Sequence, residues 1–224
     1  MATSWSASQP LARGLVGRLG RSLYSWAHRL AAVIMLVLLS PLLVVVAVMV
    51  RLDSSGPALF RQTRVGLARH PFVMLKFRTM RADCEDSEHR RYVTDMLNGD
   101  VRHGGQAGVY KLVDERVTRL GAFLRRTSID ELPQLVNVVR GDMMLVGPRP
   151  ALAWEAELFP AWAHPRFAVR PGLTGLWQVS GRNGLDYLAA LRLDVAYVTT
   201  RSVLLDLKIL LLTVSVLFGR SVTR

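Results

Sequence analysis

Two adjacent carboxylates are the residues in this sequence best suited to chemistry. Asp130 and Glu131 lie between the basic pair Arg125 and Arg126 and a run of apolar residues. Ser128 and Glu131 form an S-x-x-E pattern, which predicts a capping box at the start of a helix. In the first turn of that helix, the macrodipole would keep both carboxylates ionised. One could then attack a substrate while the other holds a metal, although helix capping alone would also explain both acidic residues.

Basic side chains near this pair favour a phosphate substrate. Arg149 lies between two prolines in the segment 147–150, and Lys76 and Arg78 lie in a second basic stretch. Fixed arginines match phosphate oxygens with two parallel hydrogen bonds. Each cation, taken alone, is equally well explained as a surface ion-pair partner. Together with Arg125 and the two carboxylates, they predict a site where a divalent cation bridges a diphosphate during phosphoryl transfer.

The composition indicates a membrane-associated chain. Half of its 224 residues are hydrophobic, yet its formal net charge is +12. Such a combination points to anionic lipid headgroups. Nucleic acid is the other usual partner of this charge, but no helix-turn-helix, zinc-finger or aromatic RNA-binding signature is present, so we expect no nucleic acid partner. Cys84 is the single cysteine, which excludes an internal disulfide and fits a cytoplasmic catalytic part.

An uncharged run of 20 residues, 31–50, is long enough to cross the hydrocarbon layer as a helix. It continues through Arg51 into a polar domain without a cleavage site, so we expect a retained anchor rather than a signal peptide. Ser40 and Pro41 lie at its centre. Proline leaves a backbone carbonyl of the preceding turn without its donor, and the Ser40 hydroxyl is placed to bind that carbonyl.

The charges on both flanks of this run bear on its topology. Basic residues collect on the cytoplasmic side of a membrane segment. Both flanks are basic here, with Arg21 and Arg29 before the run and Arg51, Arg61 and Arg64 after it. This favours a re-entrant helix that turns back at Ser40 and Pro41, with a bent single span as the alternative. The predicted organisation is a flexible basic N-terminus at 1–20, the re-entrant membrane helix at 21–52 and a catalytic domain at 53–224.

The remaining pattern predicts a small α+β domain. Two segments rich in β-branched and aromatic residues, 59–69 and 72–80, predict a strand pair that turns around 68–71. The polar segment 81–108 is expected to be an excursion, and 142–182 to be rich in fixed turns. Helical patterns cover 115–126, 131–139, 185–197 and 204–218, the last expected to lie on the membrane surface or to pack on the domain.

Motifs follow one another in a fixed order from about Arg21 to the C-terminus. They are the Ser40 and Pro41 break, FRQTRVG at 60–66, KFRTM at 76–80, RRTSIDELPQ at 125–134, NVVRGDM at 137–143, LVGPRP at 145–150, VRPGLTGLWQVSGR at 169–182, LDVAY at 193–197 and LDLKI at 205–209. In this order they resemble the bacterial sugar transferases. These are the monotopic phosphoglycosyl transferases that start exopolysaccharide, O-antigen and glycan assembly.

The resemblance implies an enzyme that transfers a sugar 1-phosphate from a UDP-sugar to polyprenyl (undecaprenyl) phosphate, with release of UMP. In the motifs, Asp130 matches the nucleophile that forms a covalent aspartyl phospho-sugar, and Glu131 matches its partner at a Mg²⁺ site. Arg149 matches the arginine that contacts substrate phosphate. The substrate-binding residues expected beside it are Lys76, Arg78, Arg125 and Arg182, the last in a segment tied to the nucleotide-sugar.

The resemblance also implies a location and a topology. The chain is expected in the bacterial inner membrane, as a cytoplasmic catalytic domain on a single Pro-broken re-entrant helix with amphipathic helices at the membrane surface. Larger members carry further membrane helices and an extra domain, so this chain is expected to be the minimal single-domain form. His28 stands where members usually have an aspartate, and the Leu-Trp-Gln motif at 176–178 favours a hexose over an acetamido sugar.

Two alternatives stay open from the sequence. A membrane-tethered binding module without chemistry would explain the anchor and the charge, but not Asp130 and Glu131 among phosphate-binding arginines. A homodimer is kept open as a partner beside the UDP-sugar, polyprenyl phosphate and the lipid bilayer.

Overall fold

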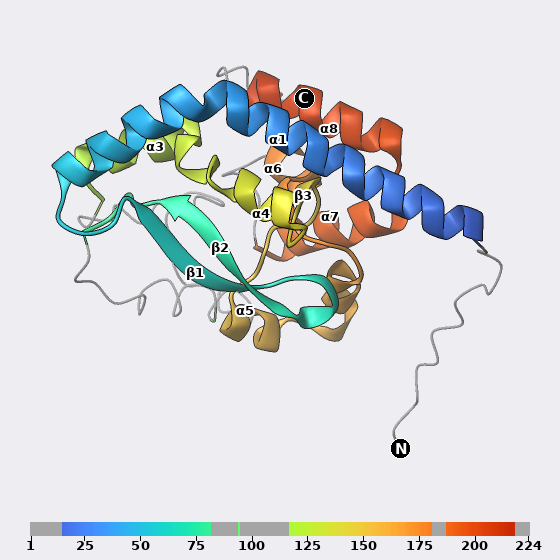
Figure 1. Cartoon of the computed structure of the whole chain (residues 1–224). Coiled ribbons are helices and arrows are strands. Elements are labelled where there is room, and N and C mark those ends of the chain that lie inside the picture. The colour runs from blue at the N-terminus through green and yellow to red at the C-terminus, as the bar shows by residue number, and fades with distance from the viewer. Residues whose placement is uncertain (1–14, 82–93, 95–116, 181–186, 218–224) are drawn as a thin grey trace.

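The computed structural model describes residues 15–81, 94, 117–180 and 187–217 (Figure 1). One long N-terminal helix lies over a mixed body of short helices and strands. The α-helices are α1 (Leu15–Asp53), α3 (Arg119–Thr127), α4 (Gln134–Arg140), α5 (Ala153–Leu158), α6 (Leu176–Ser180), α7 (Tyr187–Thr200) and α8 (Val203–Leu217). The 3₁₀ helices are η1 (Leu67–Arg69), η2 (Ile129–Glu131) and η3 (Ala161–Ala168), and the strands are β1 (Leu59–Val65), β2 (Pro71–Phe77), β3 (Met144–Val146) and β4 (Gly172–Thr174).

Helix α1 continues through its proline. Its stretch Ser22–Asp53 is the one described helix that is long and apolar enough to cross a membrane. Pro41 has no N–H, so the carbonyl of Val37 loses its helical donor. The Ser40 hydroxyl donates to that carbonyl at 2.8 Å, which confirms its expected role. The helix begins at Leu15, so residues 15–20 are helical and not the flexible segment that the sequence predicted.

The body contacts α1 on both sides of Pro41. In the N-terminal half, Ala32 is buried in a cluster that contains Leu135 of α4. In the C-terminal half, Val50 is buried with Phe77 at the end of β2. Figure 1 shows α1 lying lengthwise over the body, with α8 beside its N-terminal half and α3 beneath its C-terminal half. The helix is therefore held to one body along most of its length.

A polar cluster fixes the start of α1. His28 Nδ1 accepts a hydrogen bond from the backbone N–H of Leu145 in β3 at 3.2 Å. Its Nε2 lies 3.8 Å from Asp206 of α8, and Asp206 also accepts hydrogen bonds from the hydroxyls of Tyr24 and Tyr197. The imidazole of His28 thus binds both a strand amide and a carboxylate, where an aspartate would place a second negative charge beside Asp206.

The predicted strand pair is present. Strands β1 and β2 are antiparallel from the pair Leu59 and Phe77 to the pair Val65 and Pro71. The reversal between them is η1, in which Ala68 has a φ of 51° and the chain enters the left-handed region. A second sheet pairs β3 with β4 in parallel, between the turn-rich segments of 142–182. The described part is a mixed helix and sheet structure, which confirms the α+β character.

The helix that begins at the carboxylate pair differs from the prediction. Ser128 is left-handed, with φ 58° and ψ 17°, and forms no capping hydrogen bond through its side chain. Instead, Ile129–Glu131 is a 3₁₀ turn, and α4 begins at Gln134. Pro133 has no N–H to donate to the carbonyl of Ile129, which the N–H of Leu132 binds at 3.2 Å. The capping box was therefore a wrong prediction, because Pro133 delays the α-helix by one turn.

The other helices agree with the sequence pattern to different degrees. Helices α7 and α8 lie within three residues of their predicted bounds. Helix α3 begins at Arg119, where Thr118 accepts a hydrogen bond from the N–H of Gly121 through its side chain. Residues 115–116 and nearly all of the polar segment 81–108 lie outside the described residues. The segment 142–182, predicted as turns, also holds the short elements β3, α5, η3, β4 and α6.

Candidate active site

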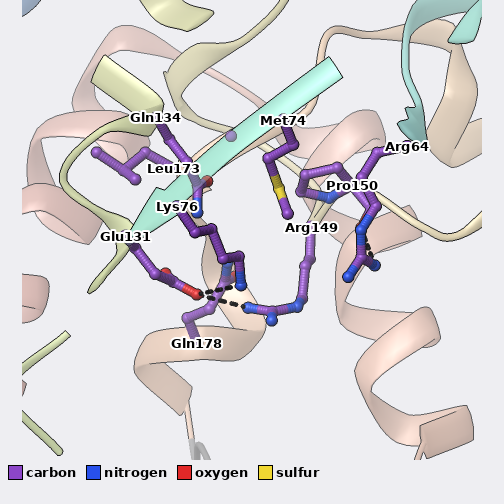
Figure 2. A pocket seen from close by; sticks show the side chains of 10 residues that line it. Arg64, Met74, Lys76, Glu131, Gln134, Arg149, Pro150, Leu173 and Gln178 are labelled. Atoms are coloured by element: carbon purple, nitrogen blue, oxygen red, sulfur yellow. Dashed lines mark hydrogen bonds and ion pairs between the residues drawn. The ribbon is translucent and has the colours of Figure 1, made fainter. Parts of the chain in front are cut away.

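A narrow pocket, partly open to solvent, lies between the hairpin and the Gly/Pro-rich turns (Figure 2). Its walls come from elements far apart in the sequence, and most of its polar lining is basic or amide. The lining residues are Arg64, Met74, Lys76, Glu131, Gln134, Arg149, Pro150, Gly172, Leu173 and Gln178.

Glu131 joins the two central cations of this pocket. Its Oε1 lies 3.4 Å from Lys76 Nζ and 3.4 Å from Arg149 Nη1 (Figure 2). Burial alone would raise the pKa of the Glu131 carboxyl, but the charges of Lys76 and Arg149 together lower it. Burial lowers the pKa of Lys76, and the charge of Glu131 partly offsets that effect. The pocket thus holds an ionised carboxylate between two cations.

Asp130 is the more basic of the two carboxylates. Asp130 is 7% exposed, and its carboxylate forms no hydrogen bond or ion pair with the residues that the structure describes. Burial and then the charge of Glu131 raise the pKa of Asp130 to about 6, against the opposing charges of Lys76, Arg125 and Arg149. The expected stabilisation of both ions by a helix dipole is therefore wrong for Asp130, because a three-residue 3₁₀ turn offers little dipole and burial dominates.

The turn that carries Arg149 is fixed through its backbone. Pro148 and Pro150 lock two φ angles around Arg149. Four consecutive carbonyls accept hydrogen bonds from three parts of the fold. Pro148 O accepts from Gly172 N of β4 at 2.9 Å, and Arg149 O accepts from Arg166 Nη2 of η3 at 2.6 Å. From β1, Arg64 Nη1 donates to Pro150 O at 3.2 Å and Val65 N donates to Ala151 O at 2.8 Å. The guanidinium of Arg149 also lies 6.0 Å from the Trp177 ring. The position of this cation is set before any ligand arrives.

Most of the predicted site residues come together. Lys76, Glu131 and Arg149 line the pocket, and Asp130 adjoins them on η2. Arg125, at the end of α3, donates through Nε to Thr79 Oγ1 at 2.9 Å and helps to lower the pKa of Asp130. Arg182 lies outside the described residues. Ser40 and Pro41 lie in α1, away from the pocket lining.

Arg78 has a different place from the one predicted. Its residue is buried, and its Nη2 donates to the carbonyls of Val50 at 3.2 Å and Ser54 at 2.6 Å. These carbonyls belong to the C-terminal end of α1, where helical acceptors have no helical donors of their own. The structure thus places Arg78 at the C-terminal end of α1 and outside the pocket lining, through the one nitrogen that is bound to backbone, and its contact with substrate stays a prediction.

Three polar residues of the pocket were missed by the sequence reasoning. Arg64 was counted only as a flanking charge, although it lies in the FRQTRVG segment and faces the site from β1. Gln134 and Gln178 also lie in quoted motifs, but an amide has no charge pattern that singles it out. The Oε1 of Gln178 is buried and has no partner among the described residues, so a donor on a ligand would satisfy it.

The carboxylates of Asp130 and Glu131 offer oxygen ligands that suit Mg²⁺. No group of three or more His, Cys, Asp and Glu side chains gathers as a metal cage within the described residues. Mg²⁺ in phosphoryl-transfer sites is usually held by one or two carboxylates together with substrate phosphates. Asp130 and Glu131 supply two adjacent carboxylates whose mutual repulsion a cation would relieve. The residues present therefore fit a cation whose remaining ligands come from a bound diphosphate.

The comparisons with known proteins agree with this chemistry. A family model described as bacterial sugar transferase matches residues 21–220. The galactosyl transferase CpsE of Streptococcus agalactiae serotype III is 44% identical over 163 residues, 72% of this chain and 34% of that protein. The UDP-glucose:undecaprenyl-phosphate glucose-1-phosphate transferase of Caulobacter vibrioides is 45% identical over 193 residues, 82% of this chain and 65% of that protein.

A shorter relative matches over most of its own length. The exopolysaccharide production protein ExoY of Rhizobium meliloti is 39% identical over 185 residues, which are 83% of this chain and 80% of ExoY. The chain thus spans about a third of CpsE and 65% of the Caulobacter protein, but most of ExoY.

Arg149 should be the main diphosphate contact in the pocket. We expect Arg149→Ala to raise the dissociation constant for UDP with Mg²⁺ by about tenfold to a hundredfold, measured by titration calorimetry, because one charge-assisted contact contributes about 1.5–3 kcal/mol. Arg149→Lys should recover only part of this binding, since lysine cannot form two parallel hydrogen bonds.

The matched control is Arg192→Ala, which removes an exposed arginine that lies 5.9 Å from the Trp162 ring and outside the pocket. It should bind UDP as the unaltered protein does. Equal affinities for Arg149→Ala and the unaltered protein would make Arg149 a purely structural residue.

Proposed function

This chain belongs to the bacterial sugar transferase family, and on that basis we propose that it transfers a sugar 1-phosphate from a UDP-sugar to polyprenyl phosphate, with release of UMP. The observation that carries the proposal is Glu131 between Lys76 and Arg149, with the more basic Asp130 beside it. The names of relatives support the same reaction, including an undecaprenyl-phosphate glucose phosphotransferase of Komagataeibacter xylinus at 40% identity.

Asp130 is the better nucleophile of the two carboxylates. Glu131 is bound to two cations, which lowers its basicity, whereas the pKa of Asp130 is raised to about 6 by burial. A more basic carboxylate is a stronger nucleophile, and at neutral pH this one is still largely ionised. We therefore assign Asp130 to attack and Glu131 to hold the cations in place.

The reaction divides into two displacements at one phosphorus atom. An oxygen of Asp130 attacks the phosphorus that bears the sugar, and the bond to the UMP oxygen breaks, so UMP leaves with the electron pair. An oxygen of polyprenyl phosphate then attacks the same phosphorus, and the Asp130 carboxylate leaves. The product is polyprenyl diphospho-sugar. Arg149 and Lys76 hold the phosphate oxygens and offset the charge that develops on them.

In this proposal Asp130 and Glu131 would hold Mg²⁺ together with the diphosphate of the substrate. When bound, it supplies further neutralisation of the diphosphate charge. Basic side chains of the protein would supply the remaining positive charge around the diphosphate. Among the described residues, Arg64 at the pocket wall and Arg125 beside Asp130 join Arg149 as arginines around the two carboxylates.

The packing of α1 supports a re-entrant helix and a site at headgroup depth. Because the same body contacts α1 on both sides of Pro41, a perpendicular span would draw that body into the hydrocarbon layer. A broad apolar surface faces away from the body on both helices. Its exposed members include Leu30, Ile34, Val37, Leu38, Leu42, Val45 and Val48 on α1 and Leu204, Leu207, Leu211 and Val214 on α8. We place this surface in the cytoplasmic leaflet, with the pocket open to the cytoplasm where UDP-sugars are found.

The sugar is proposed to be a hexose. Several relatives at 40–45% identity are named for galactose or for glucose, and the Leu-Trp-Gln segment at 176–178 favoured a hexose from the sequence. Trp177 lies near Arg149, and Gln178 lines the pocket, so this segment is placed to contact the sugar.

The test of the activity is a panel of UDP-sugars incubated with membranes that contain the chain. We expect release of UMP with UDP-glucose or UDP-galactose and polyprenyl phosphate, and less release with UDP-N-acetyl sugars. A membrane-tethered binding module would bind UDP-sugars and release no UMP. UMP release with no lipid product would also contradict the proposed transfer.

The topology is tested with single cysteines in a Cys84→Ser background. Ser22→Cys and Ser55→Cys change one atom each at exposed positions near the two ends of α1. We expect a membrane-impermeant maleimide to label both from the cytoplasmic side only, in inverted vesicles. Labelling of Ser22→Cys from the periplasmic side would show a bent single span instead.

A further inference from the structure

A buried ion pair lies directly behind the turn that carries Arg149. Arg166 of η3 and Asp194 of α7 are 5% and 2% exposed, and Arg166 Nη2 lies 2.6 Å from Asp194 Oδ2. The guanidinium lies 4.9 Å from the Phe159 ring and 5.5 Å from the Phe167 ring. Neither residue lines the pocket.

Stability does not explain this pair. Its surroundings are an apolar cluster that includes Phe159, Phe167 and Leu191. Removing two charges from water is costly, and replacement of such a pair by neutral residues is often neutral or stabilising. Asp194 Oδ1 and Arg166 Nε are buried without a partner among the described residues, so the pair is not fully compensated even here. A role other than stability is therefore favoured.

The pair reaches the pocket through the backbone of Arg149. Arg166 Nη2, which binds Asp194, also donates to the carbonyl oxygen of Arg149 at 2.6 Å. Asp194 fixes the guanidinium of Arg166, and Arg166 fixes the peptide from which the Arg149 side chain rises. In Figure 2 that side chain extends from the turn towards Glu131, so a rotation of the peptide would move the guanidinium off its partners.

We propose that Arg166 and Asp194 are positioning residues that aim the Arg149 guanidinium at the diphosphate of the substrate. They touch neither the substrate nor the reacting atoms, and they act through the backbone of Arg149. The inference rests on the proposed function for the role of Arg149 in binding a UDP-sugar.

The main test is a variant that removes both charges and keeps both shapes, Arg166→Met with Asp194→Asn. Because no charge is left unpaired, we expect its thermal midpoint to stay within about 5 °C of the unaltered protein. The dissociation constant for UDP with Mg²⁺ should rise about tenfold, and kcat/KM for the UDP-sugar should fall about tenfold or more, since small misplacements of a binding group reduce turnover strongly.

A double-mutant cycle with Arg149→Ala separates positioning from a general structural role. In the Arg149→Ala background the same pair of changes should alter UDP affinity by less than about twofold, because the residue that they aim is gone. A purely structural pair would weaken binding by the same factor in both backgrounds. That result would overturn the proposal. So would an unaltered UDP affinity of the Arg166→Met, Asp194→Asn variant that retains Arg149.

A second variant keeps the experiment decisive if the first one fails to fold. Arg166→Lys retains the buried charge pair but shortens the side chain, so that one group cannot bind Asp194 and Arg149 O in the same geometry. It should fold, lose UDP affinity and show the same dependence on Arg149. If the unaltered protein binds UDP but releases no UMP from any UDP-sugar, the proposed function fails while the positioning inference is still tested by binding.

Discussion

The ion pairs of Glu131 with Lys76 and Arg149 are the interactions on which the site depends. One carboxylate oxygen lies 3.4 Å from each cation, and the three residues come from η2, β2 and the turn after β3. Loss of Glu131 would leave two partly buried cations facing each other without a counter-charge. The three elements therefore have to meet, and the pocket is the space between them. Burial, and then the charge of Glu131, leave the neighbouring Asp130 as the more basic carboxylate.

The second constraint is the attachment of α1 to the body on both sides of its proline. Apolar contacts hold the N-terminal half near α4 and the C-terminal half near β2, while Arg78 binds the final carbonyls. In the arrangement that we propose, the exposed apolar side of this helix lies in lipid and the pocket lies beside the headgroups. This arrangement suits a reaction between a soluble phosphate donor and a phosphate carried on a lipid, since neither substrate has to leave its own phase.

Local patterns in the sequence predicted the local structure well and the long-range pairings poorly. The strand pair, α7, α8 and the Ser40 hydrogen bond to Val37 depend on neighbours in the chain, and each was found. The left-handed conformation of Ser128 was missed. The capping pattern placed the helix start at Ser128, whereas Pro133, which has no N–H, moves the start of α4 to Gln134. Arg78 was assigned to the substrate because composition cannot tell a cation that caps a helix from one that binds phosphate. The contact of Arg166 with the Arg149 carbonyl was not predicted, since it joins residues 17 positions apart, and no local pattern indicates that they meet.

The most direct measurement of the central claim is the state of Asp130 after exposure to a UDP-sugar alone. Protein in lipid nanodiscs would be mixed with UDP-glucose or UDP-galactose and Mg²⁺, quenched rapidly in acid, and digested for mass spectrometry. We expect one hexose phosphate on the peptide that contains Asp130, loss of this label on addition of polyprenyl phosphate, and no label in Asp130→Asn, whose side chain keeps the same shape. An unlabelled protein at every quench time, together with transferase activity in Asp130→Asn, would contradict the account and make direct attack by the lipid phosphate the mechanism.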